Sequence, residues 1–396
     1  MASSADKVTL KKINRLLAHF SGKGAQYAGV SLPLRNLSDL SRLPVSRRED
    51  LVAFTKKTAI KNVFHVTATS GTTRTRLVIA RCEQAHLTHI RRLGKIYRSA
   101  GITRRDLCLN ICSYSLNSGG TLMEQGYRAV GAGVIPLGEL DTAAKVAEAA
   151  ALVKTLRPTV VNSYTNQLFP LFAALGKGHT IRRCIVNGEP LFPSFKKQIE
   201  RMSGAHIHDH YGAMEVSGFA IAQKTDDGYM RVFDDGLFLE ILREDGETAT
   251  CGRGALLVTD TENTCMPFIR YRLGDTVELI RRGGGLWIKV LGRVEDSILI
   301  SGVVCASVEV TRVFQEAVGH PEFFLVIEKD PVTYKDRIVL NVALGGGAHA
   351  VIMGRLRQSS TFAGLTQVRE YTGEIPRMAN GKFRHIIDAR LKLAKV

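Results

Sequence analysis

The sequence of 396 residues lacks any run of about 18 uncharged apolar residues, so no segment is predicted to cross a membrane. Its first residues include lysines but no long apolar stretch, and a secretory leader is not expected. The seven cysteines are scattered and none forms a Cys-x-x-Cys pair, which argues against a disulfide framework and a zinc site. Internal repeats and low-complexity linkers are also missing. A cytoplasmic protein is expected.

Acidic residues are scarce relative to basic ones: 37 against 54, for a formal net charge of +17. The basic residues occur as dispersed pairs, such as Arg91-Arg92, and not as a basic block interleaved with aromatic residues. A nucleic acid is therefore not the expected partner. A basic surface suits anionic small ligands such as ATP or coenzyme A, and equally an acidic protein. A basic surface without a specific partner is the alternative that composition leaves open.

A chain of this length usually folds around more than one hydrophobic core, so two or three domains are expected. From about residue 60 to 290, short apolar runs alternate with helical patterns, which is typical of an α/β protein. The predicted strands are Val63–Val66, Leu107–Ile111, Gly133–Leu137, Thr159–Asn162 and Cys184–Val186. The predicted helices include Thr142–Leu156 and Pro193–Met202. The region Leu237–Val258 is predicted to form strands around an acidic turn at Arg243–Gly246.

After Gly292 the pattern changes to that of a compact α+β unit of about 100 residues, a normal domain size. A hairpin comes first, and the elements expected after it are a helix at Ser307–Val318, strands at Phe323–Glu328 and Arg337–Ala343, and a helix at His349–Arg357. We therefore expect a large N-terminal domain over residues 1–292 and a small C-terminal domain over 293–396.

The first motif with chemical meaning is Thr67–Arg74, directly after the predicted strand Val63–Val66. Hydroxyl groups and a glycine in this position can surround phosphate oxygens with O–H and N–H donors. The segment lacks the Gly-Lys-Ser/Thr of a Walker loop, which excludes that class. Taken alone, it is more often a polar turn without a ligand.

The second motif is Asp209–Glu215, after the predicted strand Ala205–His208. A carboxylate at a strand end can hold Mg²⁺ beside substrate phosphates. Tyr211 and Gly212 could stack an adenine and let it approach the backbone. An ordinary turn with a solvated glutamate is the alternative.

Three further motifs follow in the second half of the chain. The segments Tyr271–Asp275 and Gly292–Asp296 each carry charged residues that can hold ribose hydroxyls or a phosphate. The segment Ile375–Lys382 ends in a lysine on a glycine-containing loop, which could reach a reacting carboxylate and phosphate. Each of the three is generic by itself, because most such turns carry no ligand.

The order of the five motifs along the chain resembles that of the adenylate-forming superfamily: acyl-coenzyme A ligases, amino-acid-activating domains and luciferases. Within it, the chain is most similar to the phenylacetate–coenzyme A ligase branch, over residues 60–390. The segments that carry this likeness are Ser113–Gly120, Gly131–Pro136, Arg157–Val160, Gly188–Pro190, Ile269–Arg272 and Ile375–Arg377.

The resemblance implies an α/β fold in which a large domain of layered sheets and helices carries a small, mobile α+β domain. It implies a two-step reaction with ATP and Mg²⁺: a small carboxylic acid becomes acyl-AMP with release of pyrophosphate, and the acyl group then passes to coenzyme A. The catalysis would be charge stabilisation and positioning, since a carboxylate is already ionised at neutral pH.

The resemblance also assigns roles to individual residues. Lys382, Glu215 and Arg293 would be catalytic, with Glu215 binding Mg²⁺, and Glu295 would lie at the hinge. The residues assigned to ATP and AMP are Ser70, Gly71, Thr72, Thr73, Gly188, Glu189, Pro190, Tyr211, Gly212, Asp275 and Arg293. Those assigned to the acyl pocket are Tyr114, Asn117, Gly119, Gly120 and Ala213.

The chain departs from the family pattern at three places. Arg74-Thr75-Arg76 replaces the glycine and proline of the phosphate loop, and arginine does not adopt a positive φ cheaply. Met214 replaces the hydroxyl residue before the magnesium glutamate. Asn117 stands where aryl-acid ligases carry a phenylalanine, and its amide could bind an amino or hydroxyl substituent. We therefore expect a polar-substituted aryl or short acyl acid. The alternative is that Asn117 faces solvent or backbone.

Other functions remain open at this stage. A biosynthetic ligase of the same fold would pass the acyl group to the thiol of an acyl carrier protein or to an amine, and another variant would activate an oxyanion such as nitrite. A non-catalytic nucleotide-binding homologue is disfavoured, because the four charged site residues Glu215, Asp275, Arg293 and Lys382 are all present. The cysteines are assigned no role. A structural role is expected for His210, and both a monomer and a homodimer are compatible with the sequence.

Overall fold

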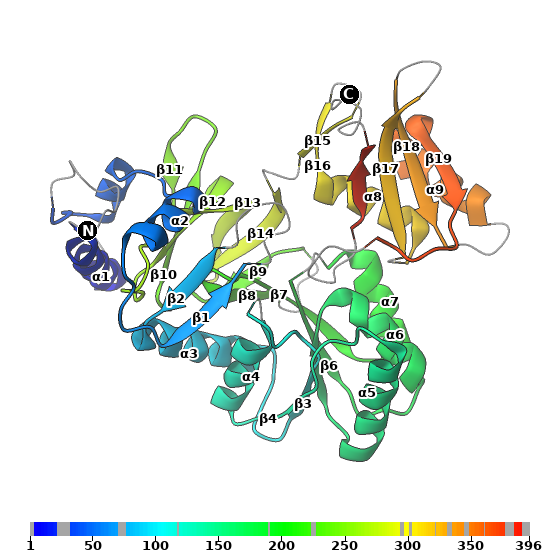
Figure 1. Ribbon diagram of the computed structural model, residues 1–396, viewed down its shortest axis with the longest axis horizontal. Coiled ribbons are helices and arrows are strands. Elements are labelled where there is room, and N and C mark those ends of the chain that lie inside the picture. The colour runs from blue at the N-terminus through cyan, green and yellow to red at the C-terminus, as the bar shows by residue number, and fades with distance from the viewer. Residues whose placement is uncertain are drawn as a thin grey trace.

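The computed structural model describes residues 4–21, 32–69, 77–116, 119–188, 191–222, 227–293, 297–300, 303–320, 322–330, 335–343, 348–359, 361–376 and 384–389. These residues form a 12-stranded sheet, a four-stranded sheet and two two-stranded sheets (Figure 1). In the same ranges, none of the helices combines the length and the apolar character that a membrane crossing requires. The α/β fold class predicted from the sequence is confirmed.

Half of the large sheet is parallel. Its strands lie in the order β4-β3-β5-β6-β7, and all neighbours in this part are parallel. Their bounds are β3 Leu107–Asn110, β4 Gly133–Pro136, β5 Val160–Ser163, β6 Arg183–Asn187 and β7 His206–Ala213. The strands predicted at β3 to β6 are confirmed to within two residues at each end.

Helices cover both faces of the parallel half (Figure 1). Their bounds are α3 Glu83–Ser99, α4 Gly119–Val130, α5 Ala143–Leu156, α6 Thr165–Leu175 and α7 Pro193–Ser203. Side chains alternate across a strand, so Cys108 packs in the core below α3 and α4 while Leu109 packs in the core below α5, α6 and α7. Thr142 caps α5 by accepting a hydrogen bond from the Lys145 amide, and Gly204, at a φ of 68°, ends α7.

The other half of the sheet is antiparallel, in the order β7-β8-β9-β14-β13-β12-β10-β11. The bounds are β8 Ser217–Ala222, β9 Met230–Val232, β10 Leu237–Leu242, β11 Thr248–Ala249, β12 Gly252–Asp260, β13 Tyr271–Arg282 and β14 Gly285–Arg293. The acidic turn Arg243–Gly246 joins β10 to β11, as expected. Asp275, expected after a turn, instead lies inside β13, a strand whose residues are alternately buried.

The N-terminal elements pack against the antiparallel half. They are α1 Ser4–Phe20, η1 Leu37–Arg42, α2 Arg48–Lys57 and the two-stranded sheet of β1 His65–Ala68 and β2 Val78–Arg81. The first strand begins two residues later than predicted, so Thr67 and Ala68 are part of the strand and not of the loop after it. Leu17 and Phe20 of α1 share a core with Ile269.

The last elements form separate sheets with their own core, at the right of Figure 1. Their bounds are β15 Ser297–Ile300, β16 Val303–Ala306, α8 Ser307–Val318, β17 Phe323–Lys329, β18 Asp336–Val342, α9 Ala348–Ser359, η3 Thr361–Leu365, β19 Thr366–Glu370 and β20 Ile386–Asp388. The predicted hairpin, helices and strands are confirmed. The division after residue 292 remains a prediction and falls at the end of β14.

Candidate active site

The direction of the chain reverses at β3. The chain runs from β3 outward to β4 and then returns to place β5 on the other side of β3. At such a switch point, the loops at the carboxyl ends of the parallel strands leave a crevice, which is where open α/β sheets bind ligands. Tyr114, Gly119 and Gly120 follow β3, and Gly188 follows β6, so these predicted site residues lie at the carboxyl edge of the sheet.

Three asparagines at the ends of β3, β5 and β6 form a buried network at this edge. The Asn162 amide donates to Asn110 Oδ1 at 2.8 Å, and the Asn187 amide donates to Asn162 Oδ1 at 3.3 Å. The Asn110 amide donates to the Tyr114 hydroxyl at 2.7 Å and to the Gly120 carbonyl at 2.9 Å. The network therefore fixes the predicted acyl-pocket segment to the strand ends.

Gly120 tolerates no side chain in this arrangement. An added Cβ would lie 2.5 Å from the Ser113 carbonyl oxygen and 2.9 Å from the Tyr114 ring. The Tyr114 hydroxyl also donates to Glu124 at 3.1 Å, and burial together with that carboxylate raises the pKa of Tyr114. Tyr114 thus presents a neutral phenol at the predicted acyl pocket.

The second motif proves to be mostly strand. The residues Asp209–Ala213 continue β7, and only residues 214–216 form the turn to β8, so the predicted strand end at His208 was wrong. Gly212 lies where β7 and β8 approach each other closely, since a Cβ there would lie 2.5 Å from the Gly218 Cα. The turn places Glu215 beyond the carboxyl end of β7.

Glu215 is held between two buried groups. Its side chain accepts a hydrogen bond from the Tyr271 hydroxyl at 3.3 Å, and burial together with this carboxylate raises the pKa of Tyr271. Arg81 is fully buried nearby and attracts Glu215 electrostatically. Burial lowers the pKa of Arg81 to about 10, so the guanidinium keeps its charge at neutral pH.

Arg81 connects the stem of the predicted phosphate loop to the Glu215 turn. It donates to Thr67 Oγ1 at 2.9 Å and to the Met214 carbonyl oxygen. Thr69, at the loop entrance, is bound by Arg48 at 2.8 Å, and its amide donates to the Leu77 carbonyl at 3.0 Å. The base of the loop is therefore closed and held beside the predicted magnesium ligand.

Tyr211 and Asp275 meet across the sheet. The Tyr211 hydroxyl donates to Asp275 Oδ2 at 2.6 Å, and Asp275 is also the cross-strand partner of Arg293. The predicted adenine residue of β7 and the predicted ribose residue of β13 are therefore in contact, and the predicted magnesium residue lies in the turn just after β7. Ala213, assigned to the acyl pocket, is half-buried at the end of β7.

Several predicted site residues lie outside the described part of the chain: Ser70, Gly71, Thr72, Thr73, Asn117, Glu189, Pro190, Glu295 and Lys382. The departures at residues 74–76 lie outside it too, and only the backbone of Arg293 is described. Their roles remain predictions.

Sequence reasoning missed Arg81 and the three asparagines. An arginine at the end of a short strand usually indicates exposed surface, so its burial could not be anticipated. The asparagines had a usable signal, because each ends a predicted parallel strand or lies next to its end.

The single carboxylate of Glu215 fits Mg²⁺. This ion keeps several waters and takes one or two carboxylates beside substrate phosphates. Among the described residues, no group of three or more His, Cys, Asp or Glu side chains is placed to hold a metal. That donor set suits an ion that arrives with ATP better than a resident structural metal.

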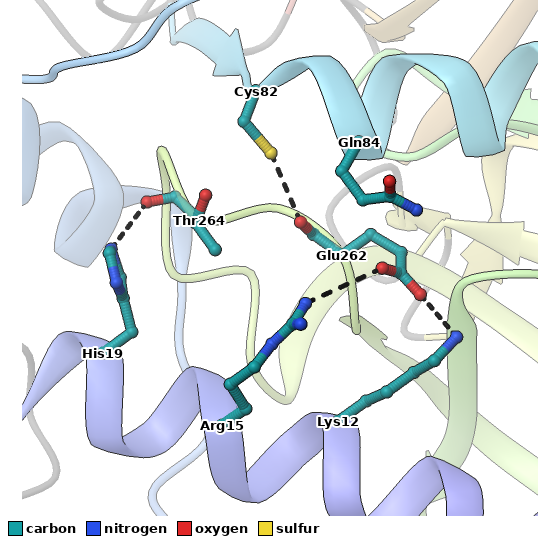
Figure 2. A pocket seen from close by; sticks show the side chains of 7 residues that line it. All are labelled: Lys12, Arg15, His19, Cys82, Gln84, Glu262 and Thr264. Carbon is teal, nitrogen blue, oxygen red and sulfur yellow. Dashed lines mark hydrogen bonds and ion pairs between the residues drawn. The ribbon is translucent and has the colours of Figure 1, made fainter.

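A cavity of about 680 Å³ lies elsewhere, between α1 and residues 262–264 (Figure 2). Glu262, buried within it, pairs with Lys12 at 2.5 Å and with Arg15 at 4.0 Å. His19 contacts the Thr264 carbonyl at 3.0 Å, and Cys82 donates to the Glu262 carbonyl at 3.3 Å. The contacts of Lys12, Arg15 and His19 attach α1 to the segment after β12, and none of the four contacts involves a predicted site residue.

No family model matches the chain. It is 29% identical over 288 residues to a phenylacetate–coenzyme A ligase of Escherichia coli, which covers 68% of this chain and 65% of that protein. It is 24% identical over 408 residues to a phenylacetate–coenzyme A ligase of Thermus thermophilus, which covers 90% of this chain and 88% of that protein.

Among solved structures, the chain matches a 2-hydroxyisobutyryl-coenzyme A ligase, in the postadenylation state with 2-HIB-AMP, at a TM-score of 0.81 and 19% identity. That match covers 98% of this chain and 90% of the ligase. The similarity to phenylacetate–coenzyme A ligases is thereby confirmed, and the chain has the fold of the adenylate-forming coenzyme A ligases.

Proposed function

We propose that this protein activates a small carboxylic acid with ATP and Mg²⁺ and transfers the acyl group to coenzyme A. The observation that carries the proposal is the convergence of Tyr211, Asp275 and Glu215 at one edge of the sheet, with Arg81 holding the phosphate-loop stem beside them. Both curated relatives are named as ligases of this kind.

In the first half-reaction, an oxygen of the carboxylate forms a bond to the α-phosphorus of ATP. The bond from that phosphorus to the bridging oxygen breaks, and pyrophosphate leaves with the electron pair. In the second, the thiol sulfur of coenzyme A attacks the acyl carbon, its proton is lost, and AMP leaves. The carboxylate of the first step is already ionised at neutral pH, so positioning and charge stabilisation are the protein's contribution to that step.

The site residues divide this work. Asp275, fixed by Tyr211, would accept hydrogen bonds from ribose hydroxyls. Glu215 would hold Mg²⁺, which neutralises phosphate charge when bound. The residues 70–73 would surround the outer phosphates, and Lys382 would carry a positive charge to the reacting carboxylate and the α-phosphate.

The chain is proposed to work as two domains, residues 1–292 and 293–396, with Lys382 on the second. Support comes from the last strands and helices, which have their own sheets and core. Cys305 and Phe314, for example, belong to that core. A unit with its own core can move as a body about the segment after β14.

The test is pyrophosphate release from ATP and Mg²⁺ over a panel of carboxylic acids. We expect release that depends on the acid and that is lost in Lys382→Ala. The matched control is Lys177→Ala, since Lys177 is an exposed lysine in the loop before β6, at the opposite edge of the sheet. Release without any acid, or release unchanged in Lys382→Ala, would contradict the proposal.

The acceptor is tested in the same assay. Coenzyme A, an acyl carrier protein and simple amines are offered in turn to the acyl-AMP, and the product is identified by mass. We expect the coenzyme A thioester. Transfer only to a carrier thiol or an amine would support the proposed first half-reaction and contradict the proposed second one. Activation of nitrite alone would contradict both half-reactions.

A further inference from the structure

His210 is a buried polar side chain without a partner. It is 2% exposed, and among the described residues neither of its ring nitrogens has a hydrogen-bond partner. Buried polar groups are almost always hydrogen-bonded in native proteins, because leaving them unpaired costs free energy. An imidazole of this kind next to a predicted site needs a partner, and the part of the chain that the structure describes does not supply one.

The ring lies toward the catalytic edge of the sheet. His210 is the cross-strand partner of Asn187, the last residue of β6, so their side chains share one face of the sheet. An added Cβ on Gly218 would lie 2.1 Å from His210 Nε2. Gly218 pairs with Gly212, two residues further along β7. The imidazole therefore extends along β7 toward its carboxyl end.

The surroundings of His210 connect it to the predicted acyl pocket. The Tyr97 ring contacts His210 edge-on at 5.8 Å between centroids, and the Tyr97 hydroxyl donates to Met123 Sδ at 2.7 Å. At Gly119, an added Cβ would meet nothing closer than Met123 and Asn187 Oδ1, both at 3.8 Å. The space beside Gly119 at the start of α4 is thus open to a ligand, and it lies on the same face of the sheet as His210 and Asn187.

Neighbouring polar groups are already engaged. The Asn187 amide is bound to Asn162 Oδ1 and to the Ser163 carbonyl, each at 3.3 Å. Burial lowers the pKa of His210 to about 4, and the cation of Arg92 acts in the same direction. The ring is therefore neutral at physiological pH and offers one donor and one acceptor.

The geometry points to His210 as the residue that selects the acid, by hydrogen-bonding a hydroxyl or amino substituent on its acyl group. This inference rests on the proposed function and names its substrate class as hydroxy- or amino-substituted acids. A hydroxyl or an amine can both donate and accept, so either matches a neutral imidazole. A site built to bind such a group rejects the unsubstituted analogue strongly, because the protein group is then left unpaired.

The experiment compares kcat/KM for pyrophosphate release between phenylacetate and its ring-hydroxylated and amino derivatives, using the full chain. We expect the wild type to prefer a substituted acid by about tenfold or more. His210→Leu should remove that preference by lowering kcat/KM for the substituted acid alone. His210→Asn, which keeps a donor and an acceptor, should retain part of it.

The matched control is His208→Leu. His208 lies on the same face of β7, is similarly buried, and is bound through Nδ1 to the Ala222 carbonyl at 3.2 Å. His208→Leu should leave the ratio of kcat/KM between the two acids unchanged.

The inference is overturned, with acid activation still standing, when the wild type has the same kcat/KM for both acids, as when a buried water is the partner of His210. An equal loss of kcat/KM for both acids in His210→Leu also overturns the inference and leaves acid activation standing. Silence with every acid overturns both proposals.

Discussion

The hydroxyl of Tyr211 donates a 2.6 Å hydrogen bond to the carboxylate of Asp275, which lies 64 positions later in the chain. The contact joins β7, the last strand of the parallel half, to β13 in the antiparallel half. A residue predicted to contact adenine thereby orients one predicted to bind ribose. The predicted nucleotide site thus takes residues from both halves of the large sheet.

Removing this hydrogen bond tests that relationship. In Tyr211→Phe, we expect KM for ATP to rise about tenfold, since a hydrogen bond to a charged group contributes about 1.5 kcal/mol or more. Steady-state kinetics with saturating acid measures it. Tyr229→Phe is the control, because Tyr229 lies in the antiparallel half away from this contact. An unchanged KM in Tyr211→Phe would show that Asp275 is oriented without it.

Glu215→Gln tests the magnesium site. The amide keeps the shape of the side chain but loses the negative charge, so the concentration of Mg²⁺ needed for half-maximal pyrophosphate release should rise, with a rate loss of about 100-fold. Titration of Mg²⁺ at fixed ATP measures both. The control is Glu244→Gln in the exposed acidic turn. The same Mg²⁺ dependence in Glu215→Gln and wild type would remove Glu215 from this role.

Arg81→Met tests the buried link between the loop stem and the Glu215 turn. The methionine fills space but leaves the Met214 carbonyl and Thr67 hydroxyl without their donor, and we expect a loss of about 2–4 kcal/mol in the free energy of unfolding. Urea denaturation measures it. Arg91→Met, at an exposed position of α3, should change stability by less than about 0.5 kcal/mol. Equal effects of the two changes would contradict the link.

Acid should destabilise the protein from about pH 6.5 downward. His89 is fully buried beside Asp260, and burial together with Arg92 lowers its pKa from 6.5 to about 3. Between these values the unfolded chain binds a proton that the folded chain does not. Folding stability therefore falls as pH decreases, by up to about 1.4 kcal/mol per pH unit from this group.

Urea denaturation at pH 7.5, 6.5 and 5.5 measures this dependence. His208 and His210, whose pKa values burial lowers to about 4, should add to the slope in the same direction. Below pH 6.5, His89→Gln should reduce the slope of the free energy of unfolding against pH by the amount that corresponds to one bound proton. Stability that stays constant from pH 7.5 to 5.5 would rule out buried neutral histidines.

Much of the fold could be predicted because its signals are local. The apolar runs at β3 to β6 and the helical spacing of α5 placed those elements to within a few residues. The errors came from glycine-containing motifs taken as turns. Tyr271–Asp275 lies within a strand in which buried and half-buried residues alternate, and this alternation was visible in the sequence as Tyr, Leu, Asp, Val and Leu at every second position.

The candidate site was harder to predict, because its supporting groups depend on tertiary packing. No local pattern distinguishes Arg81, fully buried at the end of a four-residue strand, from a surface arginine. His210 was expected to be structural, and only the arrangement of β6, β8 and α3 around it shows an imidazole that none of the described residues hydrogen-bonds. The joint order of the motifs, by contrast, could be read from the sequence alone.

The position of β7 in the sheet has a practical consequence. It is the strand at which parallel pairing gives way to antiparallel pairing, with Asn110, Asn162 and Asn187 on one side and Asp275 on the other. The residues predicted to bind the nucleotide lie on both sides of this point, with Tyr211 on β7 and Asp275 on β13, whereas Tyr114, Gly119 and Gly120, predicted for the acyl pocket, all follow β3. An engineer could therefore diversify the short segment between β3 and α4 to accept new acids without changing any residue predicted to bind ATP.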